Sequence, residues 1–121
     1  MGKFEDLRVW QRSKDLSVIV YRITSCNPID KDFGLKDQLR RASVSIPSNI
    51  AEGDESGTSK MAVKYFYMAK GSLAELFTQV LIALEVGYLE DKIAENLTNE
   101  CKAISSMLTL LIRSRSIKPI T

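Results

Sequence analysis

The chain of 121 residues contains no histidine and only two cysteines. Histidine is the usual general base near neutral pH and the commonest metal ligand, so Ser-His and Cys-His dyads are excluded within this chain. Zinc sites built on histidine are excluded as well, and Cys26 and Cys101 are too few for a zinc site made of cysteine alone. Di-iron sites in helix bundles need Glu-x-x-His repeats, so the absence of histidine excludes them too. We therefore expect neither a metal nor a cofactor.

Long apolar runs and a signal segment are also missing. Charged side chains interrupt the first ten residues, which have no apolar signal core. The longest apolar stretches, such as residues 18–21 and 110–112, are far shorter than the ~20 residues that span a bilayer. Two cysteines without a secretory signal are typical of reduced, buried thiols. We expect a cytoplasmic protein that makes no membrane contact.

The residues that are present favour a helical fold. Hydrophobic residues make up 45% and charged residues 26% of the chain, which are globular proportions, and the length fits one domain over residues 1–121. Apolar spacing is helical almost everywhere and predicts helices at about 5–25, 35–54, 59–86 and 90–114. Because short loops force neighbouring helices to reverse, we predict an all-α, antiparallel up-down-up-down four-helix bundle.

The second predicted helix contains Pro47, which removes a hydrogen-bond donor and bends or breaks a helix. Apolar residues keep their helical phase through the proline, from Ala42 and Ile46 to Ile50, which favours one helix kinked at Pro47 over two short ones. Polar residues around it resemble a catalytic cluster, but we interpret them as groups that satisfy the backbone freed by the kink. They are Ser45, Ser48, Asn49 and Glu52. A Ser-Lys hydrolase is the weakest interpretation, and we expect no enzyme.

The third predicted helix has the clearest pattern. Thr58 or Ser59 is expected to cap its N-terminus, and Gly87 has the placement of a C-cap. Its buried stripe is predicted at Phe66, Ala69, Leu73, Leu76, Val80 and Ala83. The stripe of the fourth helix is predicted at Ile93, Leu97, Cys101, Ile104, Leu108 and Leu111.

The formal net charge of +2 conceals an uneven distribution. Residues 75–100 carry six acidic side chains against Lys92, whereas residues 101–121 carry four basic side chains and no acid. In an antiparallel hairpin that turns near Gly87, the acids meet at one end and the bases at the other, so we predict a bundle that is polar along its axis. Phosphate contact and an ordinary solvated surface remain equal alternatives for the basic end. The candidate nucleic-acid contacts are Lys60, Lys64, Lys70, Arg113, Arg115 and Lys118.

Other side chains allow two interpretations each. Tyr65 and Tyr67 lie beside Lys64 and could stack on bases, although packing or interface roles are more usual for such aromatics. For Arg40 and Arg41 we favour structural ion pairs over nucleic-acid contacts. Glu52 and Glu75 are the expected partners of these arginines. Trp10, Tyr21 and Tyr88 are expected either in the bundle core and rim or at an interface.

Surplus apolar residues on the third and fourth helices favour oligomerisation, because monomers rarely expose a large apolar patch. These off-stripe residues are Val63, Phe77, Leu81, Leu84, Leu110 and Ile112.

Several motifs resemble the bacterial four-helix-bundle family encoded in intervening sequences of 23S ribosomal RNA genes, sometimes labelled ribosomal-protein-like. The same family is similar to the accessory protein of diversity-generating retroelements. The longest matching stretch is 44–53, Val-Ser-Ile-Pro-Ser-Asn-Ile-Ala-Glu-Gly. The other stretches are Phe4-Glu5-Asp6-Leu7, Val9-Trp10-Gln11, Phe33-Gly34-Leu35, Gln38-Leu39-Arg40-Arg41-Ala42, Gly71-Ser72-Leu73-Ala74-Glu75-Leu76 and Gly87-Tyr88-Leu89.

The resemblance implies a bundle that assembles into a ring, typically a homopentamer, with no established enzymatic reaction. It also implies a basic surface that, in the retroelement relatives, contacts nucleic acid and a reverse transcriptase. The chain departs from the family pattern at residues 56–61, Ser-Gly-Thr-Ser-Lys-Met, where arginines and a glutamate are usual. This departure removes phosphate-binding charge and, at Met61, one half of a capping box.

Two functional hypotheses follow. The first is a non-enzymatic, cytoplasmic homo-oligomer that binds RNA or DNA through a basic end of the ring, with a nucleic-acid enzyme such as a reverse transcriptase as a further partner. The alternative is a protein-interaction scaffold that does not bind nucleic acid.

Overall fold

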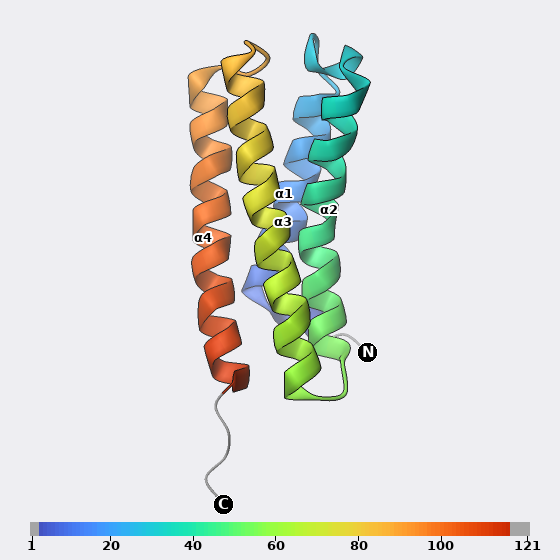
Figure 1. The fold of residues 1–121 in the computed structure, drawn as a ribbon, viewed down its shortest axis with the longest axis vertical. Helices are drawn as coiled ribbons and strands as arrows, with labels where there is room; N and C mark the ends of the chain where they lie inside the picture. The colour runs from blue at the N-terminus through green and yellow to red at the C-terminus, as the bar shows by residue number, and fades with distance from the viewer. Residues whose placement is uncertain (1–2, 117–121) are drawn as a thin grey trace, which may run out of the picture.

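Four antiparallel helices lie side by side in the computed structural model, which describes residues 3–116 (Figure 1). The α1–α2 and α3–α4 connections lie at the upper end of Figure 1, whereas α2 and α3 are joined at the lower end. The all-α bundle predicted from the sequence is therefore confirmed. Its helices are α1 (Arg8–Thr24), α2 (Phe33–Glu55), α3 (Ser59–Glu85) and α4 (Asp91–Ser116), with two 3-10 turns, η1 (Phe4–Asp6) and η2 (Ile29–Lys31).

The first helix begins three residues later than predicted. Leu7 has an extended backbone, with φ −73° and ψ 123°, and separates η1 from α1. This break lets the chain fold back, so that the Phe4 ring packs edge-on against Trp10 with 5.3 Å between centroids. Apolar spacing could not reveal the break, because it depends on contacts of side chains outside the helix.

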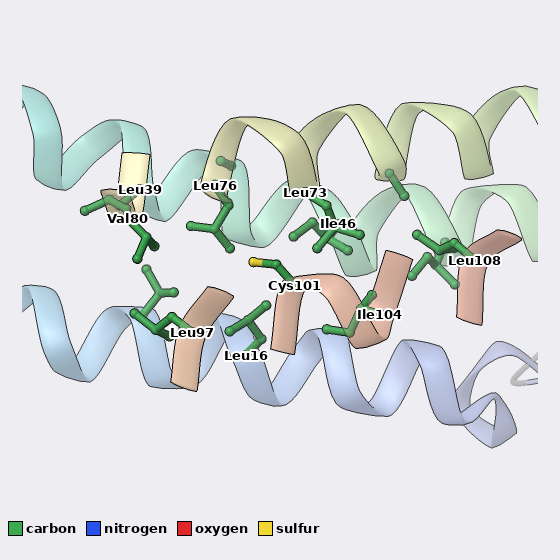
Figure 2. Packing of buried hydrophobic residues seen from close by; sticks show 14 of the residues in the cluster. Leu16, Leu39, Ile46, Leu73, Leu76, Val80, Leu97, Cys101, Ile104 and Leu108 are labelled. Atoms are coloured by element: carbon green, nitrogen blue, oxygen red, sulfur yellow. The ribbon is translucent and has the colours of Figure 1, made fainter. Parts of the chain in front are cut away.

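The predicted stripes form the core (Figure 2). All six predicted residues of α3 are buried, and Leu97, Cys101, Ile104 and Leu108 of α4 pack against the same cluster. Ile93 and Leu111 are partly buried and pack against this cluster, and two further positions differ from the prediction. Ile19 lies three residues after Leu16 and four before Ile23, a spacing that predicts a buried position on α1, but it is 43% exposed. Ile112 was counted as surplus but is buried in the core.

Pro47 lies inside one continuous helix, as expected. A proline has no N–H, so the carbonyl of Ser43, four residues earlier, loses its usual helical donor. The Ser17 hydroxyl of α1 donates a 2.7 Å hydrogen bond to this carbonyl. The freed backbone is thus satisfied from the neighbouring helix, and not by the polar residues around Pro47 to which the sequence assigned this role.

The helix ends follow the expected chemistry in two places. The Thr58 hydroxyl accepts a 3.2 Å hydrogen bond from the Met61 N–H, and Gly87 has a φ of +86° after the end of α3. Asp32 caps α2 by accepting from the Leu35 N–H at 3.1 Å, which starts this helix two residues earlier than predicted. Within residues 3–116, none of the helices combines the length and the apolar character that crossing a membrane requires.

The two cysteines differ in exposure, although both were expected to be buried. Cys26 is exposed and Cys101 is buried, and burial raises the pKa of the Cys101 thiol to about 12. Thiolates are the reactive form, and at pH 8 on the order of one Cys101 thiol in ten thousand is ionised. We expect a thiol reagent to label Cys26 quickly in the folded protein and Cys101 only after denaturation. Mass spectrometry of the peptides would check this, and rapid labelling of Cys101 in the native state would contradict the packing.

Candidate nucleic-acid interface

Three of the predicted cations project into solvent at the lower end of the bundle. Lys60 and Lys64 lie one turn apart at the start of α3, and Arg113 lies near the end of α4. All three are exposed, and none forms an ion pair with another residue of the described part of the chain. Tyr67 continues the same face of α3 and is 58% exposed, whereas Tyr65 is half-buried.

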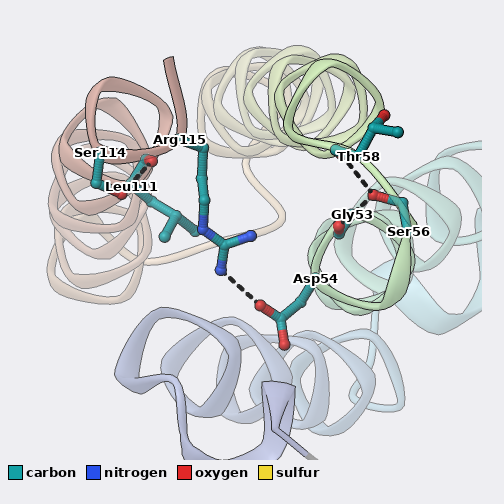
Figure 3. A network of polar contacts seen from close by, with 7 residues as sticks. All are labelled: Gly53, Asp54, Ser56, Thr58, Leu111, Ser114 and Arg115. Atoms are coloured by element: carbon teal, nitrogen blue, oxygen red, sulfur yellow. Dashed lines mark hydrogen bonds and ion pairs between the residues drawn. The ribbon is translucent and has the colours of Figure 1, made fainter. Parts of the chain in front are cut away.

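Arg115 has a structural partner instead (Figure 3). Its Nη2 lies 2.6 Å from Oδ1 of Asp54, and its guanidinium stands over the Phe66 ring at 5.5 Å. The Asp54 side chain is only 8% exposed. This pair joins the end of α4 to the end of α2, so the charge of Arg115 is largely neutralised within the bundle.

Of the remaining two candidates, Lys70 alone lies within the described residues. The Lys70 ammonium donates a 2.6 Å hydrogen bond to the Thr109 hydroxyl and so bridges α3 and α4. Lys118 lies outside the described residues. The structure thus brings Lys60, Lys64, Arg113 and Arg115 to one end, and three of these four point their charge outward.

The lower end of the bundle carries both acidic and basic side chains, whereas the charges of the α3–α4 hairpin alone predicted a basic end. The last turns of α2 carry Glu52, Asp54 and Glu55, and they end beside the start of α3. The upper end is mixed as well, because the acidic turn between α3 and α4 lies at the same end as the first turns of α2. These turns of α2 carry Lys36, Arg40 and Arg41. The axial polarity therefore belongs to the α3–α4 hairpin and not to the whole bundle. A nucleic-acid surface at the lower end is expected on the α3–α4 side.

Arg40 and Arg41 have structural contacts, but not with the residues predicted for them. Arg40 donates to the Thr24 hydroxyl at 2.8 Å and stacks over the Tyr21 ring at 4.4 Å, which holds α2 against α1. Arg41 pairs with Asp37, one turn earlier on its own helix, at 2.8 Å. The expected ion pairs with Glu52 and Glu75 are absent from residues 3–116.

One ion pair between helices could not be predicted from the sequence. Arg12 of α1 contacts both carboxylate oxygens of Glu100 on α4, at 2.9 and 2.6 Å. The hydrogen bond from Arg12 to Glu100 raises the pKa of the guanidinium. The two residues are 88 positions apart, so only the pairing of α1 with α4 could reveal their contact.

The polar residues near Pro47 form a hydrogen-bonded link between α2 and α3. Asn49 donates to the carbonyl and the hydroxyl oxygen of Ser45, at 2.8 and 2.9 Å, and the Ser72 hydroxyl lies 2.8 Å from that of Ser45. Ser48 and Glu52 are exposed and do not belong to this link. No group of His, Cys, Asp and Glu within the described residues could hold a metal ion.

Several large apolar side chains are exposed on α3 and α4. Leu81 and Leu110, two of the predicted surplus residues, are 37% and 64% exposed, whereas Val63, Phe77 and Leu84 are half-buried. The other exposed large apolar side chains of α3 are Met61, Tyr67, Met68 and Ile82, and Val86 follows the end of this helix.

Four antiparallel helices around one apolar core define an antiparallel four-helix bundle. The chain belongs to the 23S rRNA-intervening sequence protein family, whose family model matches residues 5–110. This family membership agrees with the resemblance drawn from the motifs.

A solved structure with the same fold is that of a protein of unknown function from the S23 ribosomal protein family of Bacteroides thetaiotaomicron VPI-5482. The TM-score is 0.80 at 19% sequence identity, over 87% of this chain and 98% of that chain. A comparison with curated protein sequences found no match.

Proposed function

We propose that this protein is a cytoplasmic, non-enzymatic homo-oligomer that binds single-stranded nucleic acid on the α3–α4 side of its lower end. The observation that carries the proposal is the exposed row of Lys60, Lys64 and Tyr67 along α3, at the end where α4 brings Arg113. Unpaired cations attract phosphates, and an exposed aromatic ring offers a face on which a base can stack. Arg115 and Lys70 contribute to the fold and are left out of this surface.

The oligomer rests on the exposed apolar surface of α3. Leu81, Ile82 and Val86 lie close together in the sequence at the end of α3 and are 37% to 58% exposed, and clustered apolar side chains of this kind often mark a protein interface. Following the family, we propose a ring of several copies, with five as the expected number. Light scattering coupled to size exclusion tests this, and a mass near 13.6 kDa at micromolar concentration would contradict it.

The nucleic-acid proposal predicts salt-dependent binding of a sequence without structure, such as a fluorescent oligouridine. Fluorescence anisotropy should show saturable binding at about 50 mM NaCl, which weakens steeply as salt rises because phosphate contacts release counterions. The variant K60Q/K64Q/R113Q removes three cations and should lower the slope of log K against log salt by about 2 in magnitude. In the variant Tyr67→Ala, loss of one stacking face should weaken binding about tenfold at every salt concentration.

A matched control removes three exposed cations from the upper end, in R22Q/K31Q/K92Q. This control should bind almost as the parent does, because the same charge is lost far from the proposed surface. Absence of binding at about 50 mM NaCl, or equal losses in both triple variants, would refute the proposed surface. In the first case the exposed apolar face of α3 would favour the alternative, a protein-interaction scaffold that does not bind nucleic acid.

A further inference from the structure

A polar groove of about 300 Å³ lies between α2 and α3, away from the cations of the lower end. The residues on each wall are spaced one helical turn apart, so they face the same groove. Apart from Ala42, which also belongs to the apolar core, its lining residues take part neither in that core nor in the proposed nucleic-acid surface. The groove is lined by Gln38, Arg41, Ala42 and Ser45 of α2 and by Glu75 and Gln79 of α3.

The α3 wall offers hydrogen-bond acceptors that lack donors. Gln79 is only 9% exposed, and its Oε1 is buried without a hydrogen-bond partner in residues 3–116. A buried amide oxygen left unpaired is unfavourable, so a donor from outside the chain would stabilise it. Glu75, one turn earlier, is exposed and forms neither an ion pair nor a hydrogen bond within the described chain.

The α2 wall offers donors. Arg41 uses only its Nε for Asp37, and neither terminal nitrogen of its guanidinium has an acceptor in the part of the chain that the structure describes. The side-chain amide of Gln38 lines the same wall. Arg41 and Glu75 carry opposite charges and line one groove, yet they do not pair with each other. A ligand that fits must therefore present N–H groups to α3 and acceptor atoms to α2.

We propose that this groove binds a guanine base. Guanine carries adjacent donors at N1 and N2, which a carboxylate such as that of Glu75 accepts together, and the second N2 hydrogen is available to Gln79 Oε1. Its O6 and N7 are adjacent acceptors, and paired contact of these atoms with an arginine is the commonest specific contact to this base. Adenine and cytosine lack the adjacent N–H and amino donors, and uracil has a single N–H donor. The base is supplied either by a free nucleotide or by single-stranded RNA, whose unstacked bases expose both edges.

Titration calorimetry with mononucleotides tests this on the full-length protein. GMP should bind saturably, and AMP, CMP and UMP should bind at least about tenfold more weakly. IMP lacks the N2 amino group and 7-deaza-GMP lacks the N7 acceptor, so each should also lose about tenfold. Glu75→Gln keeps the size of the side chain but turns one acceptor into a donor, and should weaken GMP binding about tenfold. Glu85→Gln, an exposed carboxylate of α3 outside the groove, should leave binding unchanged.

The arginine contact is tested separately. If Arg41 reads the O6 and N7 edge, Arg41→Gln should weaken GMP binding and abolish the difference between GMP and 7-deaza-GMP. The source of the base is tested with a short single-stranded RNA that contains one guanine and with the same RNA carrying adenine at that position. If GMP binds weakly but the guanine RNA binds more tightly than the adenine RNA, single-stranded RNA is the source. Equal binding of all nucleotides and both RNAs, or equal effects of Glu75→Gln and Glu85→Gln, would overturn the proposal. Oligouridine contains no guanine, so this result is independent of the binding proposed for the lower end.

Discussion

Replacing Gly53 by alanine is expected to lower the free energy of unfolding by about 2 kcal/mol. Gly53 lies inside α2 where this helix packs tightly against α3, and an added Cβ would stand 2.6 Å from a ring carbon of Phe66 and 3.1 Å from the Ala62 carbonyl oxygen. Phe66 is fully buried, and a backbone oxygen moves only with its helix, so the two helices must separate. Thermal or urea unfolding followed by circular dichroism would measure the loss.

Gly71→Ala is the matched control, because Gly71 lies in the interior of α3 with nothing within 4 Å of an added Cβ. Alanine favours a helix over glycine by about 0.5–1 kcal/mol, so this variant should be more stable than the parent. Opposite signs for the two substitutions would show that Gly53 is required by close packing. If Gly53→Ala is as stable as Gly71→Ala, the proposed close approach of α2 and α3 is incorrect.

The helices and most of the core could be predicted from the sequence because both depend on local spacing. The stripe from Phe66 to Ala83 and the caps at Thr58 and Gly87 follow from the periodicity of one helix and from the chemistry of its ends. Gly53 lies three residues after Ile50 and so continues the apolar stripe of Ala42, Ile46 and Ile50, but the sequence contains no sign that a side chain there would collide with Phe66. That property depends on the distance between two helices, which no single helix encodes.

The candidate site was less predictable for the same reason. Counting charges along α3 and α4 predicted the exposed cations Lys60, Lys64 and Arg113 at one end. It could not predict that α2 ends at the same place with Asp54 aimed at Arg115. Partners of Arg12, Arg40 and Arg41 likewise depend on which helices are neighbours. The groove between α2 and α3 has no sequence signature, because its walls come from separate helices.

Breaking the pair of Asp54 and Arg115 is expected to destabilise the protein by about 1.5–3 kcal/mol, the usual contribution of a hydrogen bond to a charged group. Asp54→Asn keeps the shape of the side chain and removes its charge, which leaves Arg115 above the Phe66 ring without a counter-ion. Because Asp54 is 8% exposed, little solvent is available to replace the lost contact. Urea unfolding of Asp54→Asn, of Arg115→Gln and of the double variant gives the coupling between them.

The double variant should be no less stable than the worse single variant, since each single change leaves the other charge without its partner. Additive losses would mean that the two side chains do not interact in solution. A surface pair provides the control: Arg41→Gln breaks the contact with Asp37, whose side chain is 62% exposed, and should change stability by less than about 1 kcal/mol.

The two arginines near the end of α4 allow stability and binding to be separated. Arg115 is paired with Asp54 and contacts a core aromatic ring, whereas Arg113 is exposed and unpaired within residues 3–116. Arg115→Gln should therefore lower the unfolding free energy and leave oligouridine affinity almost unchanged below its melting temperature. Arg113→Gln should do the reverse, because a surface cation contributes little to folding but one counterion to phosphate binding. Both variants remove the same charge from one helix end, so net charge alone would predict equal losses of affinity. Opposite outcomes for the two variants are expected only because Asp54 already neutralises the charge of Arg115, whereas the charge of Arg113 is free to bind phosphate.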